Sequence, residues 1–233
     1  MNTPNDSAKI LFRESSREFP YRGTVVQTLS ARYPEIGLPL NRQAQARINA
    51  RLRSQVADFS RYVAGTLYRQ AVREYRNARE HGYPFRPFEA VLEYEVTLNR
   101  DCLLSSFHDR YEFTGGAHGT TVRASDTFSL GSGRRFLLSH FFAPGQNYRR
   151  LIVSQILRQA EENMRQNPGV YFEDYRQRIL RYFNPENYFL TPDGAAVYYQ
   201  LYEIAPYASG IVTFVVSYDL LGIRLSCAGA PAR

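Results

Sequence analysis

His118 and Glu203 lie in loops of small residues and are the side chains best suited to acid–base chemistry. An imidazole and a carboxylate can act together as general acid and base. Three further titratable residues could join such a site, namely Asp109, His108 and His140. The chain has no nucleophile elbow, P-loop, zincin motif or paired-cysteine site, and His118 has no HxH or HExxH spacing. We therefore expect no catalytic residue, no metal, no cofactor, and no hydrolase or deacetylase activity.

Two loops carry His118 and Glu203. The first consists of Thr114, Gly115, Gly116, Ala117, His118 and Gly119, and the second spans residues 202–210. Each loop lies between segments with strand patterns, which predicts an ordered hairpin connection and not a segment of the hydrophobic core. Loops held by a rigid sheet are frequent sites of recognition.

Each loop has a structural and a functional interpretation. Gly115 and Gly116 can supply positive φ angles to a hairpin turn, or they can let backbone amides approach a ligand. Glu203 can cap amides of its own loop or contact a charged partner, while Pro206 restricts the loop and Tyr207 provides an aromatic anchor. The candidate ligand-binding residues are the six of the first loop, together with Glu203, Ile204, Ala205, Pro206, Tyr207 and Gly210.

The composition indicates a globular protein with a basic surface. The chain has 233 residues, of which 44% are hydrophobic, with 18 Tyr, 15 Phe and no Trp. Its formal net charge is +7, and Lys9 is the only lysine, so arginine supplies the remaining positive charge. Arginine suits anion recognition, but codon bias in a GC-rich genome is the favoured explanation of this composition. Because the chain lacks a basic recognition helix, a zinc finger and an RNP-type motif, we expect no nucleic-acid partner.

The cysteines and the apolar segments give only limited information on disulfide bonding and localisation. Cys102 and Cys227 could form a disulfide, but nothing in their spacing requires it. No run approaches 18 apolar residues, so we expect no transmembrane helix in this chain. Residues 1–7 do not resemble a signal peptide, which leaves two alternatives: a cytoplasmic protein, or one whose export signal has been removed.

The periodicity predicts an α+β fold. A strand is expected at residues 23–29, followed by a long amphipathic helix from Asn41, as N-cap, to near Glu80, interrupted at Gly65. Residues 88–99 alternate strictly, which predicts a strand with one buried face and one acidic face. Further strands are expected at residues 103–113, 121–130, 195–201 and 211–218, with helices at residues 147–165 and 171–182. This order predicts an antiparallel or mixed sheet with the long helix and further helices packed on it.

Several motifs in this region resemble the RsiV-like extracytoplasmic domains of bacteria. They are residues 111–119, 128–134, 137–142, 187–194 and 202–210, which follow one another in the family's order between residues 88 and 219. The resemblance implies an α+β domain outside the cytoplasm. Related proteins include a membrane-anchored anti-sigma factor that binds lysozyme and is then proteolysed, and domains attached to a peptidoglycan deacetylase. The family pattern also implies that the two loops lie close together and contribute to the ligand surface.

The resulting domain assignment treats the chain as one compact unit. Residues 1–8 are expected to be disordered, residues 9–112 to form an N-terminal segment, residues 113–222 a C-terminal RsiV-like segment, and residues 223–233 a flexible tail. The N-terminal segment is similar to the companion region that precedes the family's C-terminal part. The oligomeric state stays open, and the apolar row of the long helix could serve dimerisation.

We expect a non-enzymatic binding or sensing domain in the periplasm or at the cell surface, whose ligand is a lysozyme or another wall-active protein. The alternative is recognition of peptidoglycan or an anionic wall polymer. Lysozymes of the chicken type are strongly basic, so a net charge of +7 opposes their approach. Acidic residues near the loops, such as Glu112 and Glu203, could compensate locally.

Overall fold

The computed structural model describes residues 6–227 and has two β-sheets. The larger sheet has six strands in sequence order, all antiparallel to their neighbours except for the parallel pair β2 and β3. Its strands are β1 (Lys9–Tyr21), β2 (Thr24–Gly37), β3 (Phe88–Arg100), β4 (Leu103–Phe113), β5 (Thr120–Ser129) and β6 (Arg135–Phe136). The structure confirms the predicted α+β class and its mixed sheet.

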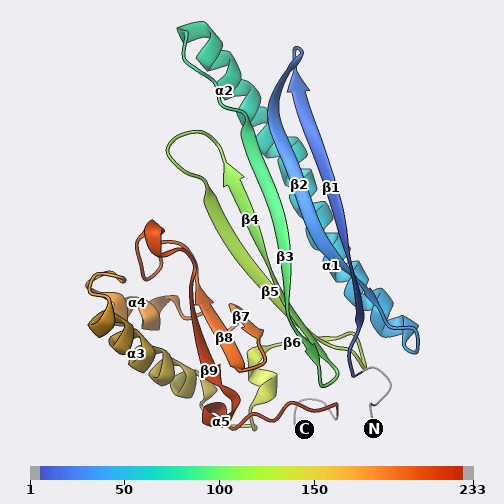
Figure 1. Cartoon of the computed structure of the whole chain (residues 1–233), viewed down its shortest axis with the longest axis vertical. Helices are drawn as coiled ribbons and strands as arrows, with labels where there is room; N and C mark the ends of the chain where they lie inside the picture. The colour runs from blue at the N-terminus through green and yellow to red at the C-terminus, as the bar shows by residue number, and fades with distance from the viewer. Residues whose placement is uncertain (1–5, 228–233) are drawn as a thin grey trace.

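A long helix makes the crossover between the parallel strands β2 and β3. It consists of α1 (Arg42–Tyr62), a π-helical turn η1 (Val63–Leu67) and α2 (Tyr68–His81), and it runs along the six-stranded sheet in Figure 1. The side chain of Asn41 accepts a hydrogen bond from the backbone of Ala44, so the predicted N-cap is confirmed. Gly82 ends the helix in the left-handed conformation, with φ of 73°.

The helix buries one face of the large sheet. Its apolar residues, such as Ile48, Leu52 and Phe59, pack against the inward residues of β2 and β3, including Leu92. The predicted alternation is confirmed over residues 88–95, because Phe88, Ala90, Leu92 and Tyr94 are buried whereas the glutamates of β3 are exposed. The strand register then shifts between Val96 and Leu98, and Leu98 packs in the core of the second layer instead. The long helix therefore leaves the opposite face of the sheet uncovered.

A three-stranded antiparallel sheet forms the second layer, beside β4 and β5 in Figure 1. Helices α3 and α4 pack on it around their own apolar core. The elements of this part are η2 (Leu138–Phe141), α3 (Tyr148–Gln166), α4 (Tyr175–Tyr182), β7 (Tyr188–Leu190), β8 (Gly194–Tyr199), η3 (Tyr207–Ser209), β9 (Val212–Ser217) and α5 (Tyr218–Leu221). No helix among residues 6–227 is long and apolar enough to cross a membrane.

The two sheets are joined through the outward residues of β4 and β5. Phe107 packs against Phe189, with ring centroids 5.0 Å apart, and Tyr198 belongs to the same small cluster. The hydroxyl of Ser105 accepts a hydrogen bond of 2.8 Å from the backbone of Leu190. These contacts cover the part of the open face that lies over β4 and β5.

The segments next to the chain ends are tied to the large sheet. Cys102 and Cys227 form a disulfide, which answers the question that their spacing left open. The backbone of Cys102 also donates a hydrogen bond to the carbonyl of Asp6. Ala8 is buried and exchanges two hydrogen bonds with the side chain of Asn99, and Ile223 is buried as well. Residues 6–8 and 223–227 thus have contacts that a disordered leader or tail would lack, whereas residues 1–5 and 228–233 lie outside the described part.

Candidate functional site

The first loop connects β4 and β5 at the end of their hairpin. Gly115 and Gly116 have φ angles of 94° and 85°, which agrees with the turn interpretation. A Cβ atom at either position would meet no other atom within 4 Å, so backbone conformation and not crowding favours glycine there. Ala117 and His118 are exposed at the end of the loop.

Gly119 plays a packing role. It is buried, and a Cβ atom at this position would overlap the ring of Tyr111 and the carbonyl oxygen of Glu112. Gly119 therefore allows the returning strand to lie against Tyr111, and it is not a surface contact as the sequence predicted.

The second loop connects β8 and β9 and is only partly at the surface. Ile204 and Ala205 have exposed fractions of 0% and 2% and belong to the core around α3 and α4. The carbonyl of Ile204 accepts a hydrogen bond from the backbone of Phe172, which holds the loop down. The prediction that these two residues contact a ligand is wrong, because their apolar side chains fill the core. Pro206, Tyr207 and Gly210 lie at the partly exposed part of the loop.

An aromatic contact brings the two loops together. The rings of His118 and Tyr207 stack with centroids 3.9 Å apart and an interplanar angle of 20°. Tyr202, which is 51% exposed, lies 5.9 Å from the ring of Tyr207. We call these three side chains the aromatic patch. The expectation that both loops lie side by side is confirmed by this stacking.

Glu203 supports its own loop. Its Oε2 atom accepts a hydrogen bond of 2.7 Å from the backbone of Gln200. Burial raises the pKa of the Glu203 carboxyl, and the Gln200 amide acts in the opposite direction. The Gln200 side chain in turn exchanges hydrogen bonds of 3.0 and 2.7 Å with the backbone of Arg123 on β5. Glu203 is thus the capping residue of a loop that is clamped to the large sheet.

The structure does not assemble the acid–base site. Nδ1 of His118 lies 3.0 Å from the carbonyl oxygen of Gly119, and no hydrogen bond or ion pair among the described residues joins His118 to Glu203. Asp109 receives two hydrogen bonds, of 2.8 and 2.7 Å, from the guanidinium of Arg123. Nδ1 of His140 accepts a hydrogen bond from the backbone of Leu137, three residues earlier.

His108 is directed away from the loops. His108 lies on the opposite face of β4 from Asp109. Its ring stacks on that of Tyr94 beneath the long helix, with the two ring centroids 4.6 Å apart. Burial, together with the nearby guanidinium groups of Arg110 and Arg51, lowers its pKa to about 3. Its imidazole is therefore neutral at physiological pH and lies 2% exposed.

One possible group of metal ligands is present among residues 6–227, and it consists of Asp6, Cys102 and Cys227. The two cysteine sulfurs of this group are joined in the disulfide. They are therefore not available as thiolate ligands while the bond is intact.

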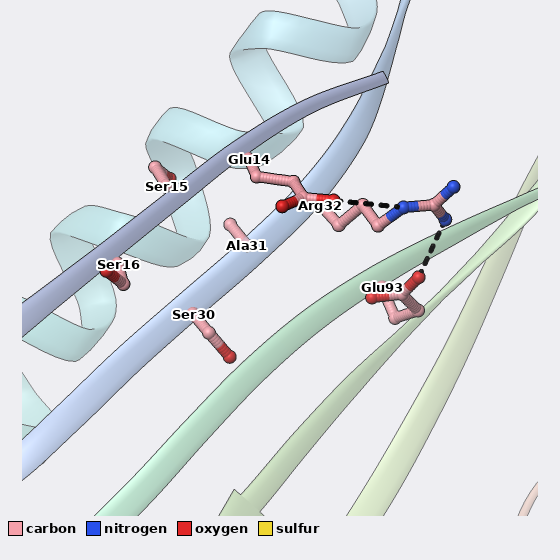
Figure 2. A pocket seen from close by; sticks show the side chains of 7 residues that line it. All are labelled: Glu14, Ser15, Ser16, Ser30, Ala31, Arg32 and Glu93. Atoms are coloured by element: carbon pink, nitrogen blue, oxygen red, sulfur yellow. Dashed lines mark hydrogen bonds and ion pairs between the residues drawn. The ribbon is translucent and has the colours of Figure 1, made fainter.

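An acidic surface spans three strands, and the sequence predicted only the part of it that lies on β3. The strand register places Glu14 opposite Arg32 and Arg32 opposite Glu93. Arg32 forms ion pairs with both carboxylates, at 3.6 and 2.9 Å (Figure 2). The same face of β1 and β3 also carries further exposed glutamates, and we call the whole set the acidic face: Glu14, Glu18, Glu89, Glu93 and Glu95.

The acidic face forms a hollow on the open side of the sheet. The hollow measures about 390 Å³, and its lining includes Glu14, Glu93, Ser16 and Ser30. In the strand register Glu93 lies opposite Asp109, and Asp109 lies opposite Arg123. The row of side chains that begins at the hollow therefore continues to β5, to which the second loop is hydrogen-bonded. The alternation of β3 predicted its acidic face, but only the strand register could add the glutamates of β1.

Comparisons with known proteins divide the chain into two matched regions. Residues 139–219 match a family model described as "Protein of unknown function (DUF3298)". Residues 23–121 match a family model described as "Deacetylase PdaC". No curated protein matches the chain.

Solved structures share the whole fold. A DUF3298 family member from Bacteroides fragilis is 16% identical with a TM-score of 0.71, and the match covers 99% of this chain and 100% of that one. A DUF3298 family protein from Pseudomonas aeruginosa is 18% identical with a TM-score of 0.65, at the same coverage of both chains. At these identities the likeness shows the fold alone.

Proposed function

We propose that this protein is a non-enzymatic binding domain of the bacterial cell envelope that recognises a basic wall-active protein of the lysozyme class. The observation that carries the proposal is the stacking of His118 on Tyr207, because it joins the exposed parts of two loops from different sheets into one surface. Tyrosine side chains bury large areas with little loss of conformational freedom, which makes them frequent anchors of protein interfaces.

The acidic face supports a basic partner. The whole chain has a formal charge of +7, yet the open face of β1, β2 and β3 carries five glutamates around Arg32. Charge is therefore segregated over the surface, and the net charge does not describe the field that a partner meets at this face. Opposite potentials accelerate encounter and fix the orientation of two proteins.

The position outside the cytoplasm is part of the proposal. The Cys102–Cys227 disulfide supports it, since such bonds persist mainly in oxidising compartments. The match of residues 23–121 to a model named for a deacetylase supports a connection with the cell wall.

The test is a calorimetric titration of the protein with chicken-type lysozyme at physiological salt. We expect saturable one-to-one binding, and we expect Pro206→Ala/Tyr207→Ala to weaken it by at least about 30-fold, since losing an interface anchor costs about 2 kcal/mol. Pro20→Ala/Tyr21→Ala is the matched control, because this proline–tyrosine pair lies at the β1–β2 turn and outside both loops. The absence of saturable heat, or an equal loss in the control, would overturn the proposal.

A second candidate is an anionic wall polymer, which the basic surface outside the acidic face favours. Charge-neutralising variants separate the two partners. Glu14→Gln/Glu93→Gln should weaken binding of a basic protein and leave binding of a polyanion unchanged or stronger. Glu74→Gln/Glu80→Gln, on the exposed surface of α2, removes the same charge elsewhere and serves as the control.

A further inference from the structure

A second surface, apart from the two loops, lies between α3 and α4. A groove of about 390 Å³ runs there, with an apolar lining formed by Val153, Leu157 and Leu180. Leu180 is 55% exposed although it is a large apolar residue. The groove is in the size range of sites for small ligands.

The two helices are antiparallel, and the groove lies at a basic end of the pair, where α3 begins and α4 finishes. Arg176 on α4 pairs with Glu161 late in α3 at 3.0 Å, whereas Arg149 at the start of α3 donates to the carbonyl of Phe183 just after α4. At the opposite end of the helix pair the carboxylates are neutralised by arginines, Glu161 by Arg176 of the other helix and Asp174 by Arg178.

The basic end has no neutralising carboxylate. Arg149 and Arg150 line the groove, and neither forms an ion pair with any residue in the described part of the chain. Both occupy the first turn of α3, which contains no acidic residue. Cations there oppose the helix dipole and destabilise the helix. Neither cation therefore stabilises α3 through its dipole, and the guanidinium of Arg149 lies over the ring of Phe183, 5.0 Å from its centroid.

We propose that this groove docks the protein on a membrane surface that contains anionic phospholipid. The guanidinium groups of Arg149 and Arg150 would bind the lipid phosphate, for which arginine has matching donor geometry. The apolar lining, with Leu180 at its exposed side, would receive the upper part of an acyl chain. The combination of two unneutralised cations with an apolar groove matches an amphiphile better than it matches a free anion, which would leave the leucines in water.

The test is co-sedimentation of the full chain with vesicles. Vesicles of equal parts phosphatidylcholine and phosphatidylglycerol should retain the protein, and vesicles of phosphatidylcholine alone should not. The double variant Arg149→Gln/Arg150→Gln should weaken binding by about 30-fold, because each basic residue at an anionic surface contributes about 1 kcal/mol. Leu180→Gln should weaken binding several-fold while leaving the circular dichroism spectrum unchanged, since this side chain is exposed.

The control is Arg73→Gln/Arg76→Gln, which removes the same charge from the exposed surface of α2. Retention by anionic vesicles that the control does not reduce supports the proposal. Equal loss in the control and the groove variant, retention by neutral vesicles, or no effect of Leu180→Gln would overturn it. None of these outcomes depends on lysozyme, so the two proposals stand or fall separately.

Discussion

His108 and Asp109 are neighbours in sequence with opposite surroundings. Asp109 lies on the face of β4 that is turned away from the long helix, and it is neutralised by Arg123, at 2.7 Å. His108 lies under the long helix, where burial and two arginines lower its pKa to about 3. A single step along a strand changes the face, so adjacent titratable residues need not share a site.

The lowered pKa of His108 predicts a loss of stability in acid. In the unfolded chain this imidazole gains its proton near pH 6.5, and in the folded protein only near pH 3. The contribution of His108 to the free energy of unfolding is therefore complete above pH 6.5, and it is lost as the pH falls toward 3. We expect a decrease in the free energy of unfolding of about 2–3 kcal/mol between pH 8 and pH 4.5 from this residue.

Urea denaturation at both pH values measures this effect. In His108→Gln the part of the pH dependence that His108 causes should disappear, whatever the variant's stability at pH 8. An unchanged pH dependence in the variant would show that His108 titrates normally in the folded protein.

At the scale of elements, the π-helical turn η1 marks the point where the long helix changes from α1 to α2. Gln27 of β2 donates a hydrogen bond of 2.8 Å to the carbonyl of Val63, the first residue of η1. The sequence indicated an interruption at Gly65, and the structure places the irregular turn there. Gly65 lies within this turn but has no positive φ, so its backbone conformation does not require glycine.

Gly65 is therefore expected to tolerate alanine. A Cβ atom there would meet only Nη1 of Arg69, at the ordinary distance of 3.9 Å. We expect Gly65→Ala to raise the free energy of unfolding by about 0.5–1 kcal/mol, because alanine loses less backbone entropy in a helix. Ala57→Gly, at an exposed position of α1, should lower it by a similar amount in the same urea titration. Destabilisation by Gly65→Ala would instead show that the π-helical turn requires glycine.

At the scale of the whole molecule, the disulfide joins the turn between β3 and β4 to the segment after α5. It links residues separated by 125 positions, so it ties the end of the second layer to the large sheet. A cross-link of this span restricts the unfolded chain strongly.

Removing this cross-link should destabilise the protein as a unit. We expect Cys102→Ala/Cys227→Ala to lower the free energy of unfolding by about 3–5 kcal/mol in chemical denaturation. The wild-type protein in a strong reductant should behave like the double variant, which controls for the substituted side chains. A difference below about 1 kcal/mol would show that packing between the layers already holds the C-terminal segment in place.

The sequence by itself determined the elements whose patterns are local. The bounds predicted for residues 103–113 match β4, and Asn41 caps α1 as expected, because alternation and capping depend on neighbours within a few residues. The strand β1 was missed. As an edge strand with charged side chains on both sides, it lacks the alternation of buried and exposed residues that marks an inner strand.

Only the tertiary structure decided which distant residues meet. The stacking of His118 on Tyr207, the row from Glu14 to Glu93 and the pairing of Cys102 with Cys227 all join segments far apart in sequence. Strand register and layer packing set these contacts, and no short pattern encodes them. The same reason explains Ile204 and Ala205, which belong to a loop by sequence and to the core by packing. The resemblance of this chain to the RsiV-like domains predicted that the two loops lie together. The core around α3 and α4 decided which residues of the second loop face solvent.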